Sequence, residues 1–127
     1  LQISHKNPKE QTMANHKMIV LQVDLSEDKA KIKEYLDYHK KVWPDVIQDL
    51  KDRPIKRMRI FNSGNRLTML LEVSHDFDIN KGIHMEPPSQ KVKEWSTLMS
   101  SFLKDVGDNK TDEWAPIDLA FDTQDYF

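Results

Sequence analysis

The sequence predicts an α+β fold in which four strands and two helices follow the order β-α-β-β-α-β. Runs rich in β-forming residues occur at 18–24, 57–62 and 67–74, and a last short run occupies 117–121. Two longer stretches between these runs carry apolar residues at helical spacing. A chain of 127 residues of which 38% are hydrophobic has room for one modest core. We therefore expect one domain over 18–127, preceded by a polar, mobile extension at 1–17.

After the first strand, a helix is expected over about 27–51. Ser26 offers a hydroxyl cap, and the acidic residues at 27 and 28 suit the positive end of the helix dipole. Pro44 falls inside this stretch and has no backbone N–H, so the helix must kink there or restart as a second segment. The solvated face of the helix is expected to carry three carboxylates, Asp37, Asp45 and Asp49.

The middle of the chain predicts a hairpin and then a long loop. Residues 57–62 and 67–74 are joined by Ser-Gly-Asn-Arg, in which Gly64 and Asn65 tolerate the positive φ of a tight turn. The run 67–74 is almost continuously apolar, as expected for a strand covered on both faces. The loop at 75–88 is too long to be only a connector, and such loops commonly form lids or binding loops.

The last part of the chain completes the pattern. Ser89 is expected to cap a helix over about 90–104 that ends near Gly107, before the final strand at 117–121. This order is that of the ferredoxin-like split βαβ arrangement, an antiparallel sheet with both helices on one face. The other face also needs cover, and the simplest cover is a second copy of the chain. We therefore expect a homodimer.

Composition excludes several classes of function. The net charge is −2 and the charges are interspersed, which argues against nucleic acid as a partner. No apolar run approaches the roughly 20 residues that span a bilayer, so we expect no membrane segment. The chain has no cysteine, which excludes disulfides and thiolate catalysis. We expect a cytoplasmic protein, although export is equally compatible with the lack of cysteine.

Phosphate and metal sites are also not indicated. There is no glycine-rich phosphate loop among the three glycines. The acidic residues and histidines of the 75–88 loop have a spacing that fits no dedicated metal motif. We expect neither a metal nor a cofactor.

The candidate chemistry lies on one helical stripe. Tyr35, His39 and Trp43 are four residues apart, so on a helix they share one face, which is otherwise apolar. A histidine can exchange a proton near neutral pH, and a phenol one turn away can bind a hydroxyl. Trp95 on the second helix could face the same pocket, where an aromatic ring suits the apolar face of a sugar. The structural alternatives are a hydrogen-bonded core histidine and a tryptophan that only packs the core.

The run from Tyr35 to Asp45 (YLDYHKKVWPD) resembles the Y-x-x-x-H-x-x-x-W-P-E segment of the L-rhamnose mutarotase family. The similarity continues through the hairpin IFNSGNRLTMLLEV and the segment from Trp95 to Met99, and spans roughly residues 18–124. The resemblance implies a dimeric ferredoxin-like α+β barrel. It also implies a cofactor-independent enzyme that interconverts the α and β anomers of a 6-deoxy sugar such as L-rhamnose or L-fucose.

The resemblance also implies roles for single residues. His39 matches the family's proton donor and Tyr35 its substrate-binding tyrosine, while Trp95 matches the first tryptophan of the sugar-binding pair. The chain departs from the family at two positions of the sugar site: Ser96 stands in place of the second tryptophan, and Met58 in place of a tyrosine. Trp43 completes the motif and is expected beside the sugar.

Two other functions stay open at this point. One is a non-catalytic protein of the same fold that binds a carbohydrate or another small ligand, which the two departures favour. The other is a cofactor-independent oxygenase-like enzyme, which rests on fold analogy alone.

Overall fold

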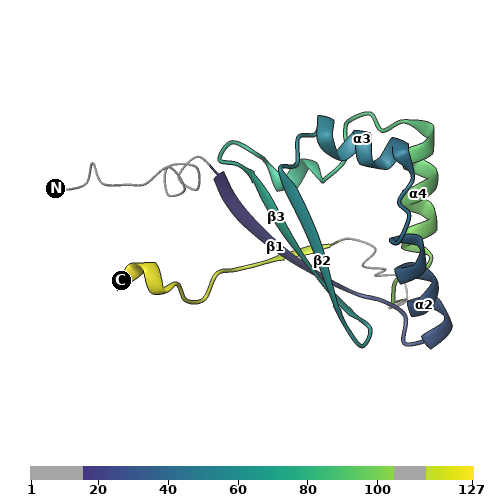
Figure 1. Cartoon of the computed structure of the whole chain (residues 1–127), viewed down its shortest axis with the longest axis horizontal. Coiled ribbons are helices and arrows are strands. Elements are labelled where there is room, and N and C mark those ends of the chain that lie inside the picture. Colours follow the sequence, from purple (N-terminus) through teal and green to yellow (C-terminus); the bar gives the residue numbers. More distant parts are fainter. Residues whose placement is uncertain (1–15, 105–113) are drawn as a thin grey trace.

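The computed structural model describes residues 16–104 and 114–127. Four strands form one antiparallel sheet in the order β2-β3-β1-β4, and the α-helices lie on one side of it (Figure 1). The predicted α+β class and ferredoxin-like order are confirmed, with the first predicted helix divided into two. The elements are β1 His16–Asp24, α2 Lys29–Tyr38, α3 Pro44–Asp52, β2 Arg57–Ser63, β3 Arg66–Ser74, η2 Ile79–Lys81, α4 Gln90–Ser100, β4 Ala115–Ile117 and η3 Thr123–Asp125.

The first strand begins earlier than predicted. β1 includes His16 and Lys17, which pair with Ser74 and Val73 of β3, so these two residues do not belong to the polar extension. The rest of that predicted extension, residues 1–15, lies outside the described residues. Pairing with the full length of β3 extends the strand, because a long neighbour offers backbone partners that local composition does not reveal.

The helix predicted over 27–51 ends and restarts. Pro44 is the first residue of α3, where its missing N–H costs nothing, and Trp43 before it is extended with φ −61° and ψ 137°. Of the two outcomes predicted at Pro44, a kink or a restart, the structure has the restart. The predicted cap is wrong: Asp28, not Ser26, is the N-cap of α2, and its carboxylate accepts the N–H of Ala30 at 2.9 Å.

The hairpin follows the prediction, whereas the strand predicted to be covered on both faces is fully buried on one face only. Gly64 has φ +59° in the turn between β2 and β3, a conformation that favours glycine. Along β3, alternate side chains are buried on the helix side of the sheet, and those between them are half-buried on the opposite face. The buried set is Leu67, Met69, Leu71 and Val73.

The C-terminal elements differ more from the prediction. Ser89 caps α4 as predicted, accepting the N–H of Val92, but the helix ends at Ser100 rather than 104, and Gly107 lies outside the described residues. The last strand is β4 at 115–117, not 117–121. It is an edge strand, where Pro116 is tolerated because one side of the strand has no partner.

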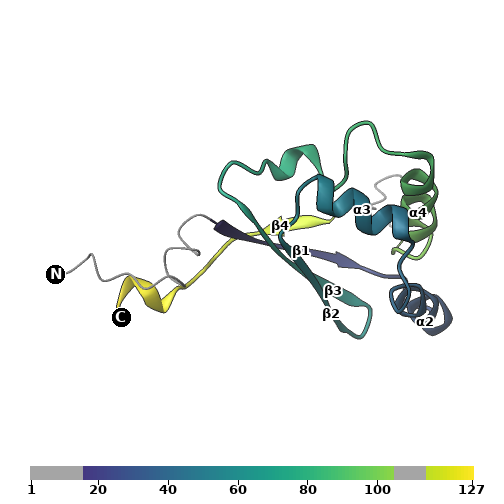
Figure 2. The ribbon, with the colours of Figure 1, turned by 45° about the horizontal axis from the view of Figure 1, so that its top comes forward.

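The helices and the C-terminal segment lie in different places around the sheet. Figure 2 shows α3 and α4 together over the sheet, while the chain after β4 leads away from the helices. Within 16–104 and 114–127, none of the helices has the length and apolar character needed to cross a membrane.

Candidate functional site

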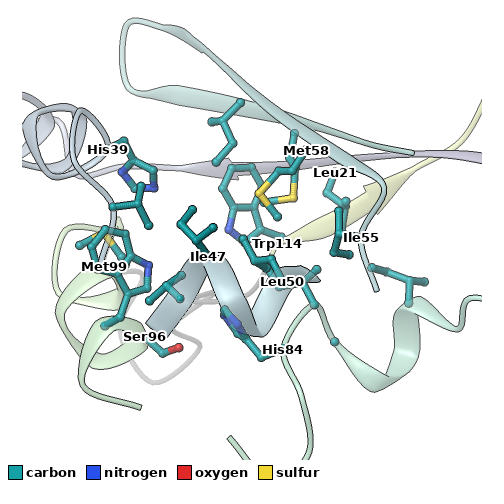
Figure 3. A pocket seen from close by; sticks show the side chains of 18 of the residues that line it. Leu21, His39, Ile47, Leu50, Ile55, Met58, His84, Ser96, Met99 and Trp114 are labelled. Atoms are coloured by element: carbon teal, nitrogen blue, oxygen red, sulfur yellow. The ribbon is translucent and has the colours of Figure 1, made fainter. Parts of the chain in front are cut away.

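A pocket of about 900 Å³ lies between the sheet and the three helices. Its walls come from the helix-facing side of the strands, from α2, α3 and α4, and from the loop after β3; Figure 3 shows part of this lining. Five of the six residues predicted for the site line it: Tyr35, His39, Met58, Trp95 and Ser96. The long loop at 75–88 contributes to the pocket, as expected of a binding loop.

His39 is held in one orientation by its own helix. It follows the last residue of α2 and caps its C-terminus, and its Nδ1 lies 2.9 Å from the carbonyl oxygen of Tyr35. A carbonyl oxygen can only accept, so Nδ1 carries the proton and Nε2 of the neutral ring keeps its lone pair. The imidazole stacks on the Tyr35 ring, with 4.3 Å between centroids, and meets the Trp95 ring at 5.4 Å.

Burial shifts both titratable groups toward their neutral forms. Removal from water lowers the pKa of His39 below the ordinary value of 6.5, and the hydrogen bond to the Tyr35 carbonyl opposes this only in part. Tyr35 is 4% exposed, and burial raises the pKa of its phenol. At neutral pH the pair is therefore an imidazole that can accept a proton beside a hydroxyl that stays protonated.

Trp95 belongs both to the core and to the wall of the pocket. It is 5% exposed and packs in a core cluster with Val46 and Val92, yet it also lines the pocket. Trp43 meets the Trp95 ring at 5.2 Å but does not line the pocket. Trp43 therefore supports the wall of the pocket from behind.

Met58 and Ser96 give the wall one apolar and one polar group. Met58 lies on the helix-facing side of β2 and offers the pocket an apolar thioether. It packs against the main core cluster, which consists of Leu21, Met69, Leu71, Val73 and Phe77. Ser96, half-buried on α4 next to Trp95, offers a hydroxyl. The pocket thus combines a few polar groups with a largely apolar lining, as is typical of small-molecule sites.

The sequence analysis missed a second polar cluster in the pocket. Asp49 was expected on a solvated helix face, but it is only 7% exposed, so that prediction is wrong for Asp49. Its carboxylate accepts Nδ1–H of His84 at 2.7 Å and the N–H of Met85 at 2.9 Å, and His84 lines the pocket. The sequence held one signal: Asp49 follows Val42 and Val46 at i+7 and i+3, on the apolar stripe.

Within the described ranges, no three histidine, aspartate or glutamate side chains gather where they could hold a metal ion. Trp114, from the segment just before β4, is a further aromatic wall of the pocket that sequence reasoning missed. It packs against the main core cluster and against a second cluster of Val23, Leu25, Tyr35, Leu67 and Phe102.

Known proteins resemble this chain over most of its length. The family model of L-rhamnose mutarotases matches residues 18–123. A UPF0734 protein of Dictyostelium discoideum is 37% identical over 116 residues, which cover 85% of this chain and 90% of that protein. An L-fucose mutarotase of Xanthomonas campestris is 34% identical over 84 residues, which cover 65% of this chain and 67% of that protein.

A solved structure shares the fold. The L-rhamnose mutarotase FA22100 of Formosa agariphila superposes with a TM-score of 0.61 at 21% identity, covering 83% of this chain and 96% of that one. At 21% sequence identity, this similarity is evidence for the fold alone.

Proposed function

Because the chain belongs to the L-rhamnose mutarotase family, we propose that it interconverts the α and β anomers of a 6-deoxy sugar in the pocket between sheet and helices. L-rhamnose and L-fucose are the first candidates, since they are the sugars of the mutarotases that resemble it. One observation carries the proposal: His39 lines the pocket with Nδ1 already bonded and the Nε2 lone pair left for a ligand.

Mutarotation needs only proton transfers at two oxygens. One group takes the proton of the anomeric hydroxyl and another protonates the ring oxygen, so that the ring opens to an aldehyde. Rotation about C1–C2 and closure on the other face of the carbonyl then give the opposite anomer. General acid–base help of this kind is worth about 10²–10⁴-fold in rate.

The protonation state of His39 at neutral pH determines whether it first accepts or first donates a proton. The resemblance implies a proton donor, but a lowered pKa and a fixed Nδ1–H make Nε2 a proton acceptor at neutral pH. In our proposal His39 takes the anomeric proton as the ring opens and, as the imidazolium that forms, returns it as the ring closes. The hydroxyl of Tyr35, or a water beside it, serves the ring oxygen.

The walls of the pocket suit a deoxy sugar. The Trp95 ring can cover the apolar face of a pyranose, and the hydroxyl of Ser96 beside it can bind a sugar hydroxyl. Met58 supports the second function considered, a protein that binds the sugar without turnover, because a thioether provides little hydrogen bonding where the family has a phenol.

Saturation-transfer NMR of the anomeric protons tests the proposal, with L-rhamnose and L-fucose side by side. His39→Asn is the informative variant, because the Asn amide can still donate to the Tyr35 carbonyl while the Nε2 position is lost. His75→Asn is the matched control, since His75 is exposed and does not line the pocket. We expect enzyme-dependent exchange that falls about 100-fold or more in His39→Asn alone.

Two outcomes would contradict the proposal. Full exchange in His39→Asn would remove His39 from the mechanism. Sugar binding without exchange in the wild-type protein would establish the binding function instead.

We propose that the active form is a homodimer joined through the sheet face opposite the helices. Val20 and Leu70 pair at the centre of that face, and the apolar side chains around them are strongly exposed. Those side chains are Met18 at 48%, Phe61 at 52% and Ile117 at 42%. The segment after β4 exposes further large apolar groups, Leu119 at 78% and Phe121 at 66%, which a second copy would cover.

A further inference from the structure

The pocket holds a second oriented histidine that the proposed chemistry leaves unused. His84 comes from the loop after β3 and lines the pocket together with His39, the C-cap residue of α2 (Figure 3). Its Nδ1 bonds the Asp49 carboxylate at 2.7 Å, and its side chain is 28% exposed. The Nδ1 edge of the His84 imidazole is therefore fixed by Asp49, and the rest of the ring is accessible from the pocket.

Both oxygens of the Asp49 carboxylate accept hydrogen bonds from the loop after β3. Asp49 is the only charged residue among the described ones that is buried, and its two oxygens accept from His84 and from the N–H of Met85. An ionised carboxylate accepts hydrogen bonds and donates none, so Nδ1 of His84 carries the proton. As with His39, the nitrogen left for a ligand is Nε2.

The loop does not depend on His84 for its attachment. The Arg53 guanidinium donates to the carbonyl oxygens of Gly82 at 2.8 and 3.0 Å and of Asp78 at 2.9 Å, and it lies 4.0 Å over the ring of Phe77. Phe77 is 5% exposed in the main core cluster. The 77–83 part of the loop is thus anchored by contacts that involve neither Asp49 nor His84.

His84 shares the pocket lining with apolar residues of α3, of the turn after it and of the loop, among them Leu50, Ile55 and Ile83. Lys51 and Asn80 are polar members of the same lining. A polar group held in one orientation at the edge of a largely apolar pocket selects how a ligand sits, because a ligand that leaves it unpaired loses a hydrogen bond.

We propose that His84 is a specificity-determining residue, which binds through Nε2 a sugar hydroxyl other than the anomeric one, and that Asp49 is its positioning residue. The inference rests on the proposed sugar site and deepens it. The ligand class is a pyranose with a free hydroxyl at the position that His84 reaches, so the protein distinguishes sugars by the presence of that hydroxyl.

His84→Asn separates this role from a structural one. An Asn amide can replace Nδ1–H as donor to Asp49, so the contact with α3 stays while the ligand-binding nitrogen is lost. Slow hydrogen exchange of the Met85 amide reports that Asp49 still holds the loop. His75→Asn, the same substitution on an exposed histidine that does not line the pocket, is the control.

The experiment measures KM and kcat of anomer exchange for the preferred sugar and for its monodeoxy analogues, one hydroxyl removed at a time. We expect His84→Asn to raise KM about 3- to 10-fold, the worth of one neutral hydrogen bond, with kcat within about twofold. One analogue should bind the wild-type protein more weakly by the same factor and show no further loss in His84→Asn. That pattern identifies the hydroxyl, and a loss of fold would not produce it.

Other outcomes overturn the inference. It fails if His84→Asn leaves KM unchanged while the Met85 amide stays protected, or if it weakens every analogue equally. If the wild-type protein exchanges neither sugar, the proposed function fails separately, and dissociation constants from ligand NMR replace KM. Equal constants for wild type and His84→Asn, or no binding by either, would then overturn the role of His84.

Discussion

Trp95→Ala tests whether one side chain supports both the core and the pocket. Trp95 is 5% exposed and contacts the rings of Tyr38, His39 and Trp43 at 5.2–6.2 Å between centroids. A tryptophan that buries about 200 Å² at about 25 cal/mol per Å² contributes about 5 kcal/mol. Measured losses for such truncations run at about 3–5 kcal/mol, which is the loss of unfolding free energy we expect.

The same variant should change how His39 titrates. Burial is the main reason that the pKa of His39 is lowered, and the Trp95 ring is one of the groups that bury it. Trp95→Ala admits water beside the imidazole, so the inflection of the pH profile of kcat/KM should move upward toward 6.5. Trp95→Phe keeps an aromatic ring there and should show a smaller shift and a smaller loss of stability.

Chemical denaturation and NMR exchange kinetics measure the two effects on one sample. The sugar affinity of Trp95→Ala should also fall, because the ring that covers the apolar face of the sugar is gone. The reasoning would be refuted by a folded Trp95→Ala protein whose unfolding free energy lies within about 1 kcal/mol of wild type. A pH profile that does not move, with that stability loss present, would show that the ring packs the core without shielding His39.

Two further predictions concern the neutral His39 and the exposed sheet face. Burial lowers the folded-state pKa of His39, so kcat/KM should be constant near neutral pH and fall as the pH drops through an inflection below 6.5. An inflection at or above 6.5 in the wild-type protein would contradict the burial argument. Phe61 is 52% exposed on the sheet face opposite the helices. Phe61→Asp places a charge in the proposed interface, so it should convert the dimer to a monomer in sedimentation while the circular dichroism spectrum stays unchanged. A wild-type protein that sediments as a monomer would contradict the proposed dimer.

The architecture was predictable because local signals agree with one another. Alternating or continuous apolar runs, a glycine turn and a Ser89 cap each specify an element without help from the rest of the chain. Element ends were less predictable, since they depend on competition between neighbours. Ser26 and Asp28 are both good capping residues, and Asp28 is the cap although Ser26 also accepts a backbone N–H, that of Asp28, at 3.1 Å.

The last strand shows how pairing decides an element that composition does not. The run 117–121 has the better strand composition, yet β4 forms at 115–117, where Leu21 lies opposite Pro116 and Val20 opposite Ile117. Those partners belong to β1, almost a hundred positions earlier in the chain. A short edge strand is positioned by its neighbour in the sheet, and a single sequence does not show which neighbour that is.

The site was predictable to the extent that it is local. Tyr35 and His39 are one helical turn apart, so their contact follows from spacing alone, and the structure has it as a ring stack at 4.3 Å. Asp49 and His84 are 35 residues apart and meet only because the loop returns to α3. Charge on Asp49 suggested solvent, whereas its place on the apolar stripe indicated burial, and the sequence contains no means of weighing one against the other.

The energetics of this long-range pair favour a role in ligand binding. A loop that only needed attachment could be held by apolar contacts, which avoid the cost of removing a carboxylate from water. This loop already has such contacts through Phe77 and has Arg53 as well. Asp49, a residue only 7% exposed, nevertheless directs its carboxylate at a histidine that lines the pocket. What the charge adds beyond attachment is a fixed tautomer, and a fixed tautomer matters only to a molecule that meets the other nitrogen.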